Sequence, residues 1–136
     1  MILLDTNIII DLIGGGEHHG AQWSRRTYDR FTGAEQFGCN LIVVAELAAE
    51  GAPANEVFRR FDTFRIEVLE LDVEGAFAAG RAHRAYRKRG GARTAILADF
   101  LIAGHAEALG ASLMTRDRRL GTYFPDLPLI TPETHP

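Results

Sequence analysis

The chain has 136 residues, of which 46% are hydrophobic, and its formal net charge is −3. This length fits one domain with a real core, which we expect to span residues 1–136. No apolar run approaches the roughly 18–20 residues of a membrane span, and the N-terminus lacks the basic segment of a signal peptide. The single cysteine, Cys39, excludes an internal disulfide and is expected to be a small buried side chain. We therefore expect a cytoplasmic globular protein.

Short apolar runs alternate with longer amphipathic segments along the chain. Residues 1–4 are apolar and end abruptly at Asp5, which is typical of a buried parallel strand with a carboxylate at its carboxyl end. Thr6 is a plausible cap for the helix that follows. In chain order we predict a strand over 2–5, helices over 6–13 and 21–32, a strand over 41–44, a helix over 45–50, a helix from 53, a strand over 66–69, helices over 73–89 and 95–109, and strands over 111–115 and 129–130.

Glycine, proline and charged residues mark the ends of these elements. Gly14–Gly16 stops the first helix, and Pro53 suits a first helical turn. Glu67 and Glu70 interrupt the third strand, which we therefore expect at the edge of the sheet. Strands that alternate with helices at this spacing predict an α/β fold, with a mostly parallel five-stranded sheet and helices on both faces.

Four carboxylates stand at junctions between predicted strands and helices: Asp5, Glu46, Asp99 and Asp117. Asp5 and Asp117 follow strands, and Glu46 is expected in the first turn of the helix after the second strand. Asp99 is expected early in an apolar helix, where the helix dipole favours an anion. Because the carboxyl ends of parallel strands meet at one edge of a sheet, we expect the four acids to gather there.

Such a cluster needs a neutralising partner. Two like charges ~4 Å apart repel by roughly 4 kcal/mol at an effective dielectric near 20, so ionised carboxylates share a pocket only with protons or cations. Oxygen ligands select hard cations, which indicates Mg²⁺, with Mn²⁺ as a possible substitute. A carboxylate-bound Mg²⁺ can activate water and bind a phosphate oxygen, as phosphodiester hydrolysis requires.

The cations are unevenly distributed. No acid interrupts the run Arg81, Arg84, Arg87, Lys88, Arg89 and Arg93. Arg84 and Lys88 share one helix face that can contact a nucleic-acid backbone, although a solvated face is an equally good interpretation. Arg116 and the pair formed by Arg118 and Arg119 flank Asp117, where they can hold phosphates near a metal or offset the acids.

Other polar residues have simpler interpretations. Asp11 is expected on the exposed face of the first helix, and Glu50, four residues after Glu46, is expected in solvent. His18 and His19 lie in a glycine-rich segment without a nearby cysteine, so a zinc site is not expected there.

Several segments together resemble the motifs of PIN-domain ribonucleases, particularly the VapC-type toxins of bacterial toxin–antitoxin pairs. In order, the segments are Met1–Asn7, Val44–Leu47, Ala98–Ala106, Leu113–Asp117, and a tail formed by Tyr123–Pro125 and Leu129–Ile130. The resemblance covers nearly the whole chain. The segment Gly14–His19 departs from the family pattern.

The resemblance implies a strand order of 3-2-1-4-5, a homodimer, an RNA substrate and a cognate antitoxin. It also implies that Asp5, Glu46, Asp99 and Asp117 bind Mg²⁺ or Mn²⁺ and catalyse cleavage. Thr6, Asn7 and Thr115 would be polar supports of the same site. The expected activity is therefore that of a Mg²⁺-dependent endoribonuclease.

Two alternatives remain open. The first is a catalytically silent PIN-fold module that binds a partner, although all four acids are present. The second is a metal-dependent phosphatase with an aspartate nucleophile. Such a site usually needs a second carboxylate two residues after the first, and Asn7 occupies that position.

Overall fold

The computed structural model describes residues 1–91 and 97–136. The strands are β1 (Ile2–Leu4), β2 (Phe37–Asn40), β3 (Ile66–Leu69), β4 (Ser112–Met114) and β5 (Leu129–Ile130). The helices are α1 (Thr6–Ile13), α2 (His19–Phe31), α3 (Leu41–Ala49), α4 (Ala54–Thr63), α5 (Val73–Lys88), α6 (Leu97–Ala108) and α7 (Leu120–Tyr123). The prediction that a helix begins at Ala95, and the cation Arg93, lie outside the described residues.

The strands form one parallel sheet in the order β3-β2-β1-β4-β5, which confirms the predicted fold class and strand order. The central strand β1 pairs with β4 so that Leu4 lies opposite Met114. This register places Asp5, the residue after β1, beside Thr115, the residue after β4. Strand β3 lies at the edge, as its interrupting glutamates indicated.

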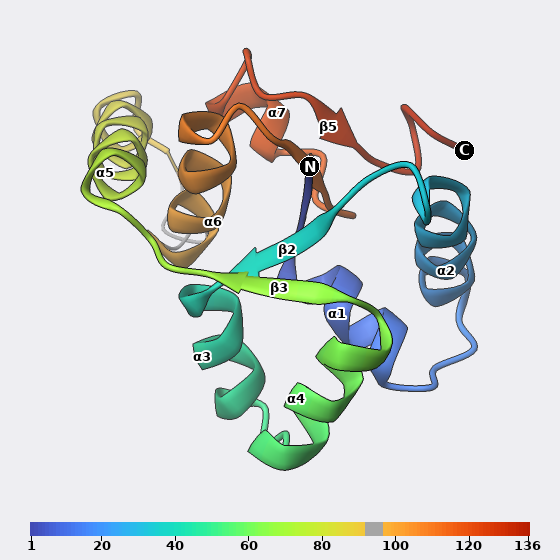
Figure 1. Cartoon of the computed structure of the whole chain (residues 1–136). Helices are drawn as coiled ribbons and strands as arrows, with labels where there is room; N and C mark the ends of the chain where they lie inside the picture. Colours follow the sequence, from blue (N-terminus) through green and yellow to red (C-terminus); the bar gives the residue numbers. More distant parts are fainter. Residues whose placement is uncertain (92–96) are drawn as a thin grey trace.

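The connections divide the helices into two groups. Helices α1 to α4 belong to crossovers that step from β1 toward β3, and α5 to α7 to crossovers that step back toward β5. Because parallel crossovers are right-handed, the two groups cover opposite faces of the sheet. In Figure 1, α1, α3 and α4 lie below β2 and β3, and α5, α6 and α7 lie above these two strands.

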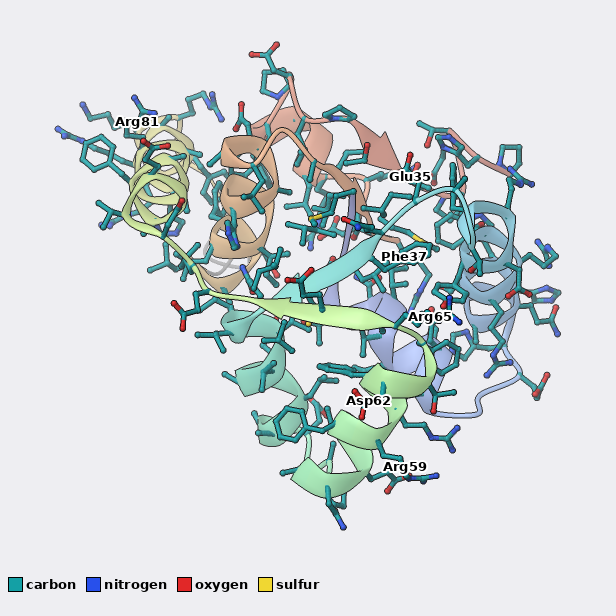
Figure 2. All side chains as sticks on the ribbon, in the orientation of Figure 1. Glu35, Phe37, Arg59, Asp62, Arg65 and Arg81 are labelled. Carbon is teal, nitrogen blue, oxygen red and sulfur yellow. The ribbon has the colours of Figure 1, made fainter. Side chains whose placement is uncertain are left out.

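The core fills the space between the sheet and the helices. The β1 residues Ile2, Leu3 and Leu4 are almost completely buried, and Trp23 and Tyr28 of α2 pack into the same core. Figure 2 shows Phe37 of β2 pointing inward, whereas Arg59 of α4 and Arg81 of α5 point away from the body of the protein. No helix within the described residues combines the length and apolar character needed to cross a membrane.

The prediction of the second strand is wrong, because the predicted residues belong to the helix that follows the real strand. Residues 41–44 form the first turn of α3, and the strand is the preceding segment Phe37–Asn40. The cause is Asn40, whose side-chain oxygen accepts hydrogen bonds from the backbone N–H groups of Ile42 (3.0 Å) and Val43 (3.2 Å). This N-cap starts the helix inside the apolar run. Glu46 therefore lies in the second turn of α3 and not in the first.

Asp5 and not Thr6 is the N-cap of α1, because the Asp5 carboxylate accepts a hydrogen bond from the backbone N–H of Thr6. Asp5 is therefore the single residue between the end of β1 and the start of α1. Asp5 is held by the sheet on one side and by the helix on the other, which fixes where its carboxylate points.

Helices α5 and α6 pack closely against each other. A Cβ atom on Gly104 of α6 would lie 2.9 Å from the Cα atom of Ala79 on α5, so the backbones approach too closely for any side chain there. Further along the pair, the Phe100 ring stacks 5.1 Å from Tyr123 and lies 5.6 Å from Tyr86. This packing places the first described turn of α6, which carries Asp99, beside the carboxyl end of α5.

Candidate active site

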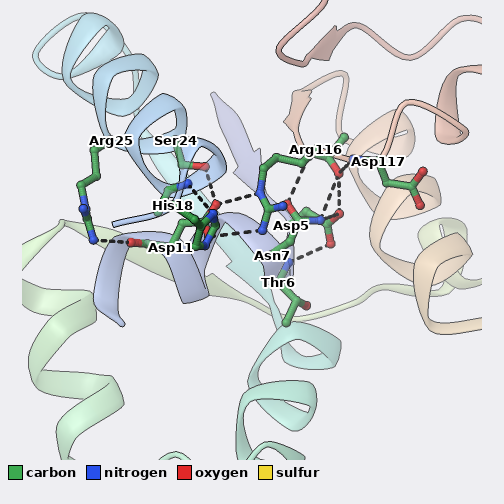
Figure 3. A network of polar contacts seen from close by, with 11 residues as sticks. Asp5, Thr6, Asn7, Asp11, His18, Ser24, Arg25, Arg116 and Asp117 are labelled. Atoms are coloured by element: carbon green, nitrogen blue, oxygen red, sulfur yellow. Dashed lines mark hydrogen bonds and ion pairs between the residues drawn. The ribbon is translucent and has the colours of Figure 1, made fainter. Parts of the chain in front are cut away.

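Three hydrogen-bond donors hold the Asp5 carboxylate, which is 7% exposed. Oδ1 accepts from the Thr6 backbone N–H at 2.8 Å, and Oδ2 accepts from Asn7 Nδ2 at 2.8 Å and from the Thr115 hydroxyl at 2.6 Å. Burial raises the pKa of Asp5 above its ordinary value, and the hydrogen bond from Thr115 opposes this rise. The predicted supports Thr6, Asn7 and Thr115 thus all lie at this carboxylate, as Figure 3 shows in part.

Glu46 reaches the same edge of the sheet from α3. Its Oε1 accepts a hydrogen bond of 2.7 Å from the Thr6 hydroxyl. Thr6 therefore contacts both acids: its backbone N–H donates to Asp5, and its hydroxyl donates to Glu46. The negative charge of Glu46 contributes to the raised pKa of Asp5, which shows that the two carboxylates lie close enough to repel each other.

Asp117 is held by the loop after β4. Its backbone N–H donates to the Thr115 hydroxyl at 2.9 Å, and its carboxylate binds Arg119 through contacts of 2.9 Å to Nε and 2.7 Å to Nη2. This bidentate pair lowers the pKa of Asp117. Arg119, one of the cations that flank Asp117 in the sequence, thus offsets the charge of one of the four acids.

Asp99 is the acid whose charge is least compensated. The pKa of Asp99 is raised to about 6, chiefly by burial and then by repulsion from Asp5, Glu46 and Asp117, in that order. Arg119 is the cation that lowers it. The four carboxylates are therefore electrostatically coupled at one edge of the sheet, although up to 112 residues of sequence separate them.

The residues present fit a hard cation. The donor set is carboxylate oxygen, and an added positive charge would relieve the repulsion that raises the pKa of Asp99. Within the described residues, no three Asp, Glu, His or Cys side chains converge closely enough to bind one ion directly. Mg²⁺ usually binds through one or two carboxylates and keeps several waters, so the other acids would act through those waters.

Asp11 is not on the exposed face of α1, and that prediction is wrong. Asp11 is 2% exposed and accepts a 2.6 Å hydrogen bond from Ser24 of α2. Arg116 forms a bidentate ion pair with it, at 2.8 Å from Nε and 3.2 Å from Nη2 (Figure 3). The signal for burial was present in the sequence, because Asp11 shares a helix stripe with the buried Ile8 and Leu12.

The other polar residues lie farther from the acids. Arg84 and Lys88 line a shallow groove on α5 together with Gly80, His83 and Arg87. The His83 ring packs 5.1 Å from Phe100, the neighbour of Asp99. Glu50 is exposed, as expected.

The fold and this edge define a class of protein. The PIN domain family matches residues 2–123, and the chain belongs to that family. The sequence motifs therefore pointed to the correct family. A comparison with curated proteins gave no match.

Solved structures with the same fold come from bacterial VapBC pairs, in agreement with the VapC-type resemblance. VapBC-1 from nontypeable Haemophilus influenzae is 26% identical, with a TM-score of 0.73 over 96% of this chain and 98% of that chain. VapBC2 from Rickettsia felis, bound to a DNA fragment from its promoter, is 23% identical, with a TM-score of 0.74 over the same shares. A DNA-bound VapBC from Salmonella typhimurium is 23% identical, with a TM-score of 0.70 over 96% of each chain.

Proposed function

We propose that this protein is a Mg²⁺-dependent endoribonuclease of the cytoplasm and the toxin of a toxin–antitoxin pair. The observation that carries the proposal is the gathering of Asp5, Glu46 and Asp117 around Asp99, whose pKa burial and then repulsion from these three acids together raise to about 6. A cluster with so much uncompensated negative charge is suited to a cation, and a PIN domain with a cation at this edge is suited to phosphodiester hydrolysis.

The chain's own residues would prepare the site before substrate arrives. Asp5, Asp99, Asp117 and Glu46 would hold Mg²⁺, or Mn²⁺ in its place, directly or through its waters. When bound, the ion lowers the pKa of a water and offsets the negative charge that develops on the phosphate. Thr115 and Asn7 keep the Asp5 carboxylate in one orientation, so that little reorganisation is needed during the reaction.

The proposed RNA path follows the carboxyl end of α5. Arg84 and Lys88 line one groove with Arg87, and this groove is connected to the acidic edge through the packing of His83 on Phe100. Phosphates bound along these cations would leave the next part of the strand near Asp99. Because such contacts are electrostatic, removing them should weaken RNA binding more at low salt than at high salt.

The proposed partners are a cognate antitoxin and a second copy of this chain. The antitoxin is supported by the similar structures, which are toxin–antitoxin complexes, one of them described as such from Klebsiella pneumoniae. The homodimer is supported by the family resemblance.

The test uses purified, antitoxin-free protein with total RNA, with Mg²⁺ and with EDTA. Asp99→Asn is the sharpest variant, because no hydrogen bond to its carboxylate is formed by the described residues. Asp5→Asn is a second variant, but its amide would face one of three donors and lower stability. Asp126→Asn, at an exposed acid, is the matched control.

We expect metal-dependent cleavage by the wild-type protein and by Asp126→Asn, and none by Asp99→Asn. Folded, metal-loaded wild-type protein that cuts no RNA would favour the silent partner-binding module. Release of phosphate from a monoester without RNA cleavage would favour the phosphatase.

A further inference from the structure

We infer that the ion pair between Asp11 and Arg116 holds the proposed metal-binding residues in position without contacting the metal itself. It joins α1 to the loop after β4 and sets the positions of Asn7, Thr115 and Asp117. The part of this inference that concerns catalysis rests on the proposed function. The part that concerns the position of the loop does not.

Asp11 is fully engaged by groups from three segments. Arg116 donates to both carboxylate oxygens, and Ser24 of α2 donates to Oδ2 at 2.6 Å. His18, before α2, places Nε2 3.4 Å from Oδ1, and Arg25 donates to the Asp11 carbonyl at 3.2 Å. The side chain of Asp11 is 1% exposed and that of Arg116 is 33% exposed. A charge buried this completely adds little to stability even when it is paired, so a role in fixing geometry is the better explanation.

The pair is connected to Asp5 by an unbroken series of hydrogen bonds. The backbone N–H of Arg116 donates to Asn7 Oδ1 at 3.1 Å, which orients the Asn7 amide group. Asn7 Nδ2 then donates to Asp5 Oδ2 at 2.8 Å. The neighbours of Arg116 complete the series, because Thr115 donates to Asp5 and accepts from the backbone N–H of Asp117. Displacing Arg116 would therefore move the donors to one proposed metal ligand and the backbone of another.

The segment that departs from the family pattern supports this ion pair. His18 Nδ1 accepts a hydrogen bond from the Ala21 backbone N–H and so caps α2. In the neutral ring the proton is then on Nε2, which faces Asp11. At Gly20 a Cβ atom would lie 3.1 Å from Cδ and 3.2 Å from Nε of Arg116. Glycine therefore lets the first turn of α2 pack directly on the Arg116 side chain. His18 thus contacts Asp11, and Gly20 leaves room for the Arg116 side chain.

The experiment compares Asp11→Asn, Arg116→Gln and the double variant with Arg26→Gln, which removes an exposed arginine from α2. Mn²⁺ is the probe, and its binding is measured without RNA by electron paramagnetic resonance. Hydrogen exchange of the Arg116 amide reports the loop independently of metal and RNA. Near-UV circular dichroism confirms that each variant is folded.

We expect either single variant to weaken Mn²⁺ binding by about tenfold, the effect typical of residues that orient metal ligands. The Arg116 amide should exchange faster in both. Because the two residues act as one unit, the double variant should be no worse than the worse single variant. Arg26→Gln should bind Mn²⁺ as the wild type does. If a single variant does not fold, the double variant tests the inference, since it leaves no unpaired buried charge.

Two results would overturn the inference. The first is folded Asp11→Asn with wild-type Mn²⁺ binding and wild-type exchange at Arg116. The second is loss of RNA binding in Arg116→Gln alone, with Asp11→Asn unaffected, which would make Arg116 a direct phosphate contact. If the wild-type protein itself binds no Mn²⁺ and cuts no RNA, the proposed function fails, while the exchange measurement still decides whether the pair fixes the loop.

Discussion

Asp99 shows how a single residue can serve a site at the expense of the fold. Its carboxyl group has a pKa of about 6 in the folded protein, against an ordinary value of 3.8. Folding is therefore favoured while this group is protonated, and the contribution is lost as the pH rises through about 6. Asp5 changes in the same direction, because burial also raises its pKa. Without a cation, neutral pH is thus unfavourable for this edge of the sheet.

Replacing Asp99 with asparagine should stabilise the metal-free protein at pH 7. We expect the free energy of unfolding to rise by roughly 1–2 kcal/mol, after allowing for partial exposure of the group. The stability of wild-type protein should fall relative to that of the variant as the pH rises from 3.8 to about 6. Urea unfolding in EDTA across this range measures the effect. If the free energy of unfolding of the two proteins changed with pH in parallel, Asp99 would not have a raised pKa in the folded protein.

Cys39 provides a second prediction for a single residue. It is 1% exposed on β2, and burial raises the pKa of its thiol to about 12. The reactive thiolate is therefore almost absent at neutral pH. We expect no alkylation of the native protein by iodoacetamide at pH 8 over an hour, and complete alkylation in urea. Rapid labelling of the native protein would mean that β2 opens locally.

Among the elements, the packing of α5 against α6 decides where Asp99 lies. Gly104 is required at their contact, where a Cβ atom would meet Ala79 at 2.8 to 2.9 Å. Gly80, on α5 itself, faces open space. A side chain is therefore excluded at Gly104, whereas there is room for one at Gly80.

The two alanine substitutions should change stability in opposite directions. Gly104→Ala should lower the free energy of unfolding by about 1–3 kcal/mol, because the helices must separate. Gly80→Ala should raise it by about 0.5–1 kcal/mol, since alanine is the better helix former. Chemical unfolding of both variants beside wild type checks the pair. A stable Gly104→Ala protein would mean that the helices can move apart at little cost.

For the whole molecule, the acidic edge couples metal binding to folding. A ligand that binds only the native state adds RT ln(1 + [L]/Kd) to the free energy of unfolding, which is about 1.4 kcal/mol at ten times Kd. We expect Mg²⁺ to raise the melting temperature of wild-type protein and of Asp126→Asn, but not that of Asp99→Asn. Thermal melts with Mg²⁺ and with EDTA measure this. An equal rise in all three proteins would indicate a cation bound elsewhere.

The sequence alone determined the fold class, the four acids and most elements. Each of these rests on local chemistry: an apolar run that ends at Asp5, a helical stripe, or a glycine stop. It misplaced the second strand because residues 41–44 are apolar enough for strand or helix, and the decision depends on the capping bonds of Asn40.

Only the tertiary structure decided which groups pair with Asp11. Its side-chain partners include Arg116, 105 residues away, and Ser24 of α2, neither of which is a neighbour in sequence. The close contact of Gly104 with Ala79 is likewise set by which helix surfaces meet. Sequence patterns report what each segment prefers by itself. The protonation and orientation of a carboxylate depend instead on groups that the folded chain brings to it.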